Sequence, residues 1–411
     1  MSKILLISHI FPPAIDGGSR VIYKLGQQFE VSGHTTLYLS SNCTSTDDFT
    51  KKQNKYSNVL TLQSSNILKL PVSSFFRKPL KFINLFIPKN THLHQLFKVF
   101  QKGPIFKFFP LIKTTIKIIK FKPDLIVAGP LPTTIILYAH FFKFLSKVLT
   151  QHNTKILINA SFHPTDTDFH QKPLIKALRL ADYLWTLTQF ETNYFIKNFK
   201  INPKKIILAG NGVDFDYCIS KVLKLQHSNI LFIGSLSAHK RVELLINSFS
   251  SLLSSNPGLQ RTLSLTIAGQ KTLFYPKIKQ IYDSLPLVIK TKINFVFNFP
   301  QSKLVKLIDN CDFLVLPSIQ ESFGLVLIES WARGKPVIVS NIPSLSELVT
   351  KTNGGLIFKT DNSIDLAQKI QKLIESPSLC FQFGQNGLKY VRNNYIWEKV
   401  SQKIYQKVKL S

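Results

Sequence analysis

The sequence predicts an α/β protein built from two doubly wound domains, each with a parallel sheet between layers of helices. Short runs of mostly apolar residues recur along the whole chain and alternate with stretches of helical periodicity. Strands that are apolar on nearly every residue are typical of parallel sheets covered on both faces. The chain has 411 residues, and domains usually contain about 100 to 200 residues, so two such domains fit its length.

Each half of the chain contains five of these runs, separated by stretches long enough for the crossover helix that a parallel pair of strands requires. One such stretch, 242–253, carries Leu245, Phe249 and Leu252 at helical spacing. The expected strands are 3–8, 34–40, 124–129, 155–160 and 183–188 in the first half, then 229–235, 263–269, 293–298, 312–318 and 335–340 in the second.

The join between the domains is expected in a polar stretch at residues 212–228. Near the C-terminus, apolar residues from Trp397 to Val408 recur every three or four positions, which predicts a helix. The expected organisation is therefore domain 1–215, domain 216–389 and a C-terminal helix, 390–411, that packs back on the first domain.

The chain is strongly basic, with 52 Lys and Arg against 22 Asp and Glu and a formal net charge of +30. Within residues 67–109 phenylalanines alternate with lysines, and no acidic residue is present. Aromatic rings beside cations suit an anionic lipid surface, so we expect this segment to contact a membrane. A core with an ordinary lysine-covered surface is the alternative. Nucleic acid is not expected as a partner, because no recognised binding module accompanies the charge.

Residues 111–122 of this basic region are expected to form a helix that covers a sheet. Ile112, Ile116 and Ile119 fall on one stripe, while the lysines fall elsewhere. This pattern predicts that these isoleucines face the sheet.

Targeting and metal signals are not evident. The N-terminal apolar run is broken by Ser8 and His9, which is too short a stretch for a signal peptide, and the apolar run 125–142 contains prolines that argue against a membrane span. The four cysteines are isolated from one another in the sequence, which argues against a disulfide scaffold or a zinc module. We therefore expect a cytoplasmic protein, with peripheral attachment at the inner face of the membrane.

Residues 317–355 carry the most specific pattern of the chain. Glu321 directly follows an expected strand, and Glu329 lies eight residues later, inside a helix expected to begin near Phe323. The free amides at a helix start and the carboxyl edge of a parallel sheet together favour an anionic ligand. The two carboxylates can accept hydrogen bonds from hydroxyls at opposite ends of one elongated ligand.

Glu321, Glu329, Gly334, Pro336 and Val337 resemble the signature of the retaining glycosyltransferase family 4, two glutamates separated by seven residues and followed by a G-x-P-V strand. The resemblance implies the GT-B fold, with two Rossmann-like domains facing a central cleft. It also implies that Glu321 is a catalytic residue that contacts the transferred sugar, and that Glu329 binds the nucleotide ribose. Donor contacts are further implied for Ser322, Phe323, Gly324 and Leu325.

Other matches to the family follow in the expected order. Gly17 and Gly18 resemble the glycine loop, where a backbone without Cβ atoms approaches the donor diphosphate. His163 follows the 155–160 strand and resembles the active-site histidine near the sugar. Asn211 to Asp214 resemble the N-G-V-D segment before the linker.

The diphosphate clamp departs from the family pattern, which supplies one arginine and one lysine to the leaving group. Lys240 matches the catalytic lysine, but Ser235 occupies the usual arginine position and His239 the alternative one. Two cations on the diphosphate assist bond breaking, so the loss of one is expected to slow the reaction. Arg241, next in the chain, and protonated His239 are the candidate replacements.

The triplet Asp166 to Asp168 reads D-x-D, the metal-binding signature of the unrelated GT-A architecture. It follows His163 in GT-B order, so neither a metal nor a cofactor is expected. The sequence thus predicts a metal-independent hexosyltransferase that moves a sugar from a nucleotide-sugar donor to a glycan or lipid-linked acceptor of the cell envelope. An impaired relative that binds the donor, suggested by Ser235, and a GT-B sugar phosphorylase or epimerase are the alternatives.

Overall fold

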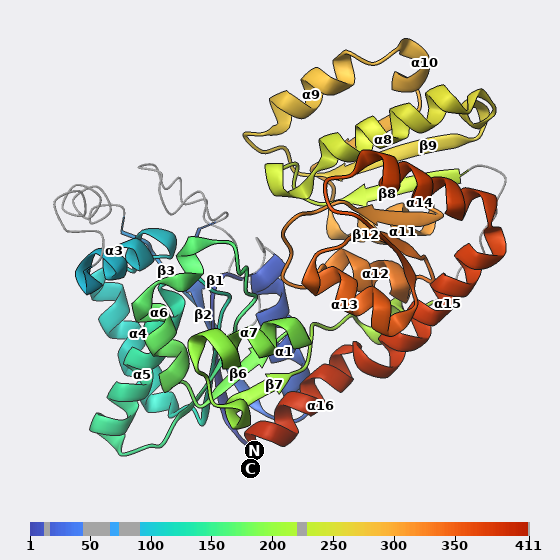
Figure 1. The fold of residues 1–411 in the computed structure, drawn as a ribbon. Helices are drawn as coiled ribbons and strands as arrows, with labels where there is room; N and C mark the ends of the chain where they lie inside the picture. The colour runs from blue at the N-terminus through green and yellow to red at the C-terminus, as the bar shows by residue number, and fades with distance from the viewer. Residues whose placement is uncertain (12–16, 44–65, 74–90, 220–227, 410–411) are drawn as a thin grey trace. The chain divides into compact units, whose positions relative to one another are not determined.

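The computed structural model describes residues 1–11, 17–43, 66–73, 91–219 and 228–409. The chain divides into two compact units (Figure 1). The first unit comprises Met1–Asn211 and Trp397–Ser411, and the second comprises Gly212–Ile396. The chain therefore leaves the first unit after Asn211 and returns to it at Trp397.

The first unit is built on a seven-stranded sheet with the order β3-β2-β1-β4-β5-β6-β7, and its neighbouring strands pair in parallel. The chain moves outward from β1 to β2 and β3 and then crosses back to β4, which makes the boundary between β1 and β4 the point where the strand order reverses. The strands are β1 (Lys3–Ile10), β2 (Thr35–Ser41), β3 (Ile67–Leu70), β4 (Leu125–Ala128), β5 (Lys155–Asn159), β6 (Tyr183–Thr186) and β7 (Ile206–Leu208).

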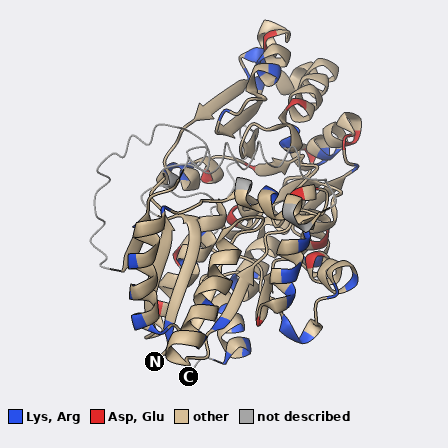
Figure 2. Ribbon diagram, turned by 90° about the vertical axis from the view of Figure 1, so that its left-hand side faces the viewer, with Lys and Arg blue, Asp and Glu red and all other residues tan. Residues whose placement is uncertain are grey.

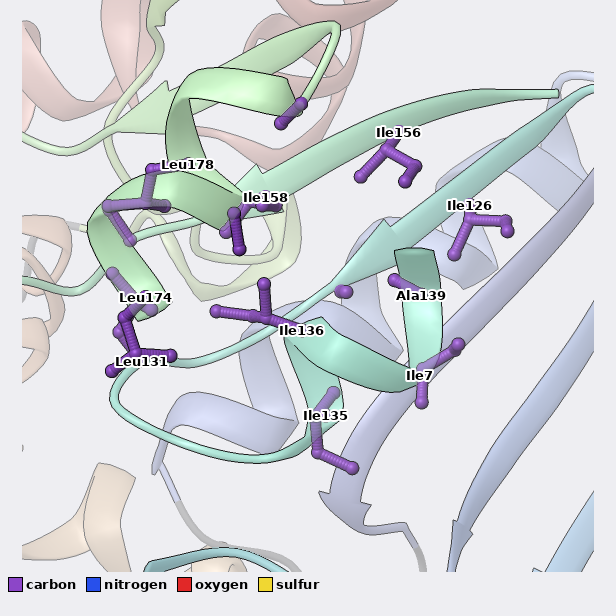
Figure 3. Close-up of a cluster of buried hydrophobic side chains, with 14 of the residues drawn as sticks. Ile7, Ile126, Leu131, Ile135, Ile136, Ala139, Ile156, Ile158, Leu174 and Leu178 are labelled. Atoms are coloured by element: carbon purple, nitrogen blue, oxygen red, sulfur yellow. The ribbon is translucent and has the colours of Figure 1, made fainter. Parts of the chain in front are cut away.

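Helices cover both faces of this sheet. On one face, α16 packs against α1. On the other, buried residues of α4 to α7 join the strands in one hydrophobic core, and Figure 3 shows Ile136, Leu174 and Leu178 from helices beside strand residues of this core. The helices are α1 (Gly17–Val31), α3 (His92–Lys102), α4 (Phe108–Phe121), α5 (Ile135–Thr150), α6 (Lys172–Leu180), α7 (Gln189–Phe199) and α16 (Trp397–Val408).

The second unit repeats the plan with a six-stranded sheet in the order β10-β9-β8-β11-β12-β13, again with parallel pairs. The order reverses between β8 and β11, so the carboxyl ends of these two strands flank the position where α/β sheets bind ligands. The strands are β8 (Ser228–Ile233), β9 (Leu263–Gly269), β10 (Ile293–Phe297), β11 (Phe313–Leu316), β12 (Val337–Ser340) and β13 (Gly355–Phe358).

Eight helices described in the second unit surround its sheet. Their apolar side chains form a second core around Phe232, Phe249 and Phe313. The helices are α8 (Val242–Ser255), α9 (Tyr275–Asp283), α10 (Leu287–Lys290), α11 (Gln301–Asp309), α12 (Leu325–Ala332), α13 (Pro343–Thr352), α14 (Ser363–Glu375) and α15 (Pro377–Asn394).

The predicted α/β class with two doubly wound sheets is confirmed. Three short strands escaped the sequence analysis, namely β3, β7 and β13, and each lies at an edge of its sheet. All three are only partly buried, so the burial that makes a central strand continuously apolar is weaker there.

The predicted orientation of residues 111–122 was wrong. A helix does form there as part of α4, but Ile112 and Ile116 are 42% and 50% exposed, whereas Thr114 and Ile118 are buried against the sheet. The helix carries two neighbouring apolar stripes, and periodicity alone does not determine which of them faces the core.

The predicted membrane segment 67–109 is described only in part, since 74–90 lies outside the described residues. Of its aromatic residues, Phe106 is buried in the core, whereas Phe108 and Phe109 at the start of α4 are exposed. Among the helices that the structure describes, none has both the length and the apolar character needed to cross a bilayer.

Candidate active site

Lys240 and Glu321 form an ion pair at the carboxyl ends of β8 and β11 in the second unit. Lys240 closes a short 3-10 turn, Ala238–Lys240, soon after β8, and Glu321 lies in the loop after β11. Because β8 and β11 are neighbours in the sheet, their carboxyl ends bring these two side chains together. Both are largely buried, with 17% and 12% of the side chain exposed, so the pair is shielded from bulk water.

Two serines that the sequence analysis missed fix the loop that carries Glu321. Ser318 Oγ donates a hydrogen bond of 3.2 Å to the Glu321 carboxylate, and Ser344 Oγ donates one of 2.7 Å to the Glu321 backbone carbonyl. Ser318 lies two residues after β11 and was within reach of sequence reasoning. Ser344 lies in the first turn of α13, and its contact depends on the folding of β12 beside β11.

The start of α12 follows this loop at Gly324. The backbone of Gly324 is left-handed, with φ +75°, and a Cβ atom there would lie 2.9 Å from Leu345 Cδ2. Only glycine adopts this conformation without strain. The N-cap residue Gly324 has no side chain that could cap α12, so the first amides of the helix can donate to an anion.

The two neighbours of Gly324 named by the sequence analysis differ in their surroundings. Phe323 is buried and packs edge to face on Tyr395, with 5.3 Å between the ring centroids, so only its backbone can reach a ligand. Ser322 and Leu325 are half-buried at the edge of the loop.

Glu329 lies one turn into α12 and is 7% exposed. The two glutamates of the predicted pair therefore belong to one strand, loop and helix connection, and neither points outward into solvent.

The residues at the predicted clamp have the following surroundings. Ser235 Oγ is 3.1 Å from Ser237 Oγ, which in turn is 3.3 Å from His239 Nδ1. Burial lowers the pKa of His239, and the adjacent Lys240 ammonium lowers it further, against a smaller opposing effect of Glu321. His239 is therefore mainly neutral near pH 7.

Arg241 is held by acidic residues. Its Nε and Nη2 donate to the two carboxylate oxygens of Asp361 at 2.8 and 3.2 Å, and Nη1 lies 3.4 Å from Glu243. The hydrogen bonds to Asp361 raise the pKa of Arg241. Asp361 is separated from Arg241 by 120 positions, and no sequence signal identified it as the partner.

The site residues predicted in the first half lie in the first unit. Gly17 and Gly18 begin α1, and the rest of the glycine loop, 12–16, is outside the described residues. A Cβ atom on Gly18 would lie 2.6 Å from Pro130 Cγ, so the packing of α1 already requires glycine there. This requirement is separate from the predicted contact with a diphosphate.

His163 follows β5, as predicted, and its ring packs edge to face on Phe169 at 5.5 Å. Nearby, the Asp166 carboxylate accepts a 2.9 Å hydrogen bond from the amide of Asp168 and caps a 3-10 turn, Thr167–His170. Within the described ranges, no cluster of three or more His, Cys, Asp or Glu side chains is arranged to hold a metal ion.

The second unit thus combines a lysine ammonium, two shielded carboxylates and an uncapped helix start at the reversal point of its sheet. Residues 219–390 match the sequence model of the family described as glycosyl transferases group 1. The match lies within the second unit, Gly212–Ile396, so this unit is similar to the family. The match covers the β8 to α15 region that contains Lys240, Glu321 and Glu329.

Curated proteins that are similar to this chain are named as glycosyltransferases. A D-inositol 3-phosphate glycosyltransferase of Corynebacterium diphtheriae is 23% identical over 275 residues, 62% of this chain and 63% of the relative. An N,N'-diacetylbacillosaminyl-diphospho-undecaprenol alpha-1,3-N-acetylgalactosaminyltransferase of Campylobacter jejuni is 30% identical over 139 residues, 28% of this chain and 37% of the relative. The chain spans less than two thirds of the length of these relatives.

The fold of the chain also matches solved structures over its full length. Anabaena HepE in complex with UDP and glucose superposes with a TM-score of 0.71 at 14% identity and covers 100% of both chains. This likeness confirms the predicted GT-B fold class.

Proposed function

We propose that this protein is a retaining glycosyltransferase that transfers a sugar from a nucleotide-sugar donor to a glycan or lipid-linked acceptor at the cytoplasmic face of a membrane. The observation that carries the proposal is the buried Lys240–Glu321 pair beside the uncapped start of α12. An ammonium group and free amides suit a diphosphate, and a carboxylate suits sugar hydroxyls.

The donor is assigned mainly to the second unit. Lys240 and the amides of Phe323, Gly324 and Leu325 bind the diphosphate, Glu321 accepts hydrogen bonds from the sugar, and Glu329 accepts them from the ribose. His163, Gly17 and Gly18 are the donor contacts predicted for the first unit. The UDP and glucose bound to HepE support a nucleotide-sugar as the donor class.

Donor binding requires the Lys240–Glu321 pair to separate, because the diphosphate competes with Glu321 for the ammonium. After the pair separates, the Lys240 ammonium binds the leaving diphosphate and the Glu321 carboxylate binds the sugar. The pair thus keeps both groups charged and in place within a shielded site, where an unpaired charge would be costly.

In the reaction the bond between the anomeric carbon and the diphosphate oxygen breaks, and a bond from the acceptor oxygen forms on the same face of the sugar. The leaving diphosphate oxygen takes the proton of the acceptor hydroxyl, so no protein base is needed. Lys240 stabilises the charge that develops on the diphosphate. Metal is not invoked, because this ammonium supplies the positive charge.

One set of observations favours a second candidate, a nucleotide-sugar-binding relative with reduced turnover. Ser235 stands where the family carries arginine, Arg241 is engaged by Asp361, and the pKa of His239 is lowered. With these three residues so arranged, Lys240 is the cation assigned to the leaving group. Donor binding without transfer or hydrolysis is the result that this candidate predicts.

The test is a thermal-shift screen of the full chain against UDP-, GDP- and ADP-sugars, followed by product analysis. A ligand at 100 times its Kd stabilises a protein by about 2.7 kcal/mol, which is readily measured. We expect one nucleotide class to stabilise the chain, and Glu329→Gln to abolish the shift. If no nucleotide-sugar stabilises the chain, the proposal is wrong. Transfer of the sugar to an acceptor with retention of the anomeric configuration supports the proposal, whereas release of a sugar phosphate or an epimer indicates the phosphorylase or epimerase alternative.

A further inference from the structure

The outer surfaces of α4 and α5 in the first unit expose large apolar side chains to an unusual degree. Of the eighteen large hydrophobic residues that are exposed among the described part of the chain, eight lie on these two helices. A concentration of this kind marks an interaction surface, whereas single exposed hydrophobic residues do not. The eight residues, which we call the α4/α5 face, are Phe108, Phe109, Ile112, Ile116, Phe141, Phe144, Val148 and Leu149.

The two helices present these residues on the same side of the unit. Ile118 of α4 and Phe142 of α5 are buried in the same core, so both helices cover the same face of the sheet and turn their outer surfaces the same way. The helices also contact each other, and the ring of Phe106, just before α4, lies 4.8 Å from that of Tyr138 in α5. The α4/α5 face is therefore one surface.

The spacing of the exposed residues makes the face a pair of stripes. On α4, Phe108, Ile112 and Ile116 are four positions apart, and on α5, Phe141, Phe144 and Val148 follow at three and four positions. Residues at these spacings lie above one another on a helix. Phe108 and Phe109 are the most exposed aromatic residues of the face, at 68% and 76%.

Lysines accompany the apolar stripes, and neither α4 nor α5 contains Asp or Glu. Lys143 is the exception among the lysines, because it forms a 2.6 Å ion pair with Asp182. In Figure 1, α4 and α5 are labelled on the left, and this side faces the viewer in Figure 2. Blue segments, which mark Lys and Arg, recur along the helices in that view. The exposed lysines are Lys107, Lys113, Lys117, Lys120 and Lys122 on or beside α4, and Lys147 on α5.

We propose that the α4/α5 face docks the protein on an anionic lipid bilayer. Rings and aliphatic side chains enter the boundary between headgroups and acyl chains, and the lysines extend from the same helices to the lipid phosphates. The inference rests on the proposed function in one respect: docking would bring the protein to a lipid-linked acceptor. The surface differs from the predicted segment 67–109, with which it shares only Phe108 and Phe109.

A second copy of the chain fits this face less well than a bilayer does. In a two-fold dimer the same patch meets itself, so the lysines of one α4 would approach those of the other. No acidic residue on either helix could balance them. A membrane with anionic headgroups supplies both the apolar phase and the opposite charge.

The experiment is co-sedimentation of the full chain with vesicles of phosphatidylcholine alone or mixed with phosphatidylglycerol. We expect binding to the mixed vesicles and little binding to phosphatidylcholine alone. Two variants test the face, Phe109→Gln/Phe144→Gln for the apolar part and Lys113→Gln/Lys117→Gln for the charge. Since each lysine near an anionic surface contributes about fivefold to partitioning, the lysine variant should bind roughly 25-fold more weakly. The phenylalanine variant should lose at least about tenfold, because it removes two rings from the apolar phase.

Matched control variants change exposed residues of the same kinds in the second unit, Leu273→Gln/Phe381→Gln and Lys372→Gln/Lys389→Gln. These should bind like the unaltered chain. The inference is wrong if the test and control variants bind vesicles equally well, or if the protein binds both vesicle types equally well. It is also wrong if the protein does not bind vesicles and sedimentation velocity shows a dimer that the Phe109→Gln/Phe144→Gln substitutions dissociate.

The thermal shift caused by the donor is measured on the same variants, so that the proposed function and the membrane docking are tested separately. The α4/α5 variants should retain it, because the donor residues lie mainly in the second unit. Vesicle binding without any donor shift overturns the proposed function alone, and a donor shift without vesicle binding overturns the docking inference alone.

Discussion

Lys240 and Glu321 neutralise each other at the ends of two neighbouring strands, although 81 positions separate them in the sequence. The same sheet boundary carries the uncapped start of α12. Charges held in a shielded site before a ligand arrives need little rearrangement during the reaction, so the pair is the first target for mutation.

Lys240→Ala should weaken the donor-induced thermal shift and lower the rate of donor turnover by about 10²- to 10³-fold. The reason is that this variant removes the ammonium assigned to the leaving diphosphate and the positive charge beside Glu321. The rate of nucleotide diphosphate release measures the effect, with the exposed Lys372→Ala as the control. Equal rates in both variants would contradict the role of Lys240.

Asp361→Asn should raise donor turnover by a few fold if Arg241 can take the place of the missing clamp arginine, because the substitution weakens the hold of Asp361 on the guanidinium. Asp361 is about half exposed, so the change in the free energy of unfolding should stay below about 1 kcal/mol. Adding Arg241→Ala should cancel the gain. A gain that survives the second substitution would show that Arg241 is not the source.

Arg333→Ala should lower the free energy of unfolding by about 3 to 5 kcal/mol, because it leaves a buried carboxylate without its cation. Arg333 Nε and Nη2 donate to the two oxygens of Asp309 at 2.7 and 2.9 Å, and their side chains are 5% and 10% exposed. Urea denaturation measures the loss. The exposed pair of Lys279 and Asp283 provides the control, where Lys279→Ala should lower the free energy of unfolding far less, because water screens the pair.

Gly324→Ala should destabilise the chain more than Gly33→Ala does. Both glycines have positive φ, +75° and +83°, so both substitutions carry the backbone strain of about 1 to 2 kcal/mol. Only Gly324 also has a neighbour in the way, Leu345 Cδ2 at 2.9 Å, whereas the space around Gly33 is open to 4 Å. Thermal unfolding of the two variants isolates the steric part, and equal losses would mean that Leu345 moves aside freely.

His239→Asn should reduce the loss of stability in mild acid. Burial and Lys240 lower the pKa of His239 in the folded protein, while the unfolded chain takes up a proton near pH 6.5. The unfolded state therefore binds more protons as the pH falls below about 6.5, and the free energy of unfolding decreases there. Urea denaturation between pH 8 and 5 should show a steeper decline for the unaltered chain. Parallel declines would contradict the assignment to His239.

The sequence predicted the parts of the protein that depend on local pattern. Central strands such as β1 and β11 are continuous apolar runs because both faces are covered, and Glu321 and Glu329 lie on one strand, loop and helix unit. The Arg241–Asp361 and Ser344–Glu321 contacts depend on which strands lie side by side, which no local pattern specifies. The outward direction of Ile112 was missed for a related reason, because α4 has two apolar stripes and the sheet can accept either.

The path of the chain has a consequence for synthesis. The first unit starts with β1, yet α16, which packs on α1, is translated after the entire second unit. A ribosome making this protein therefore exposes the apolar side of α1 for the time needed to translate nearly two hundred residues, and a chaperone that shields this helix would act before α16 emerges.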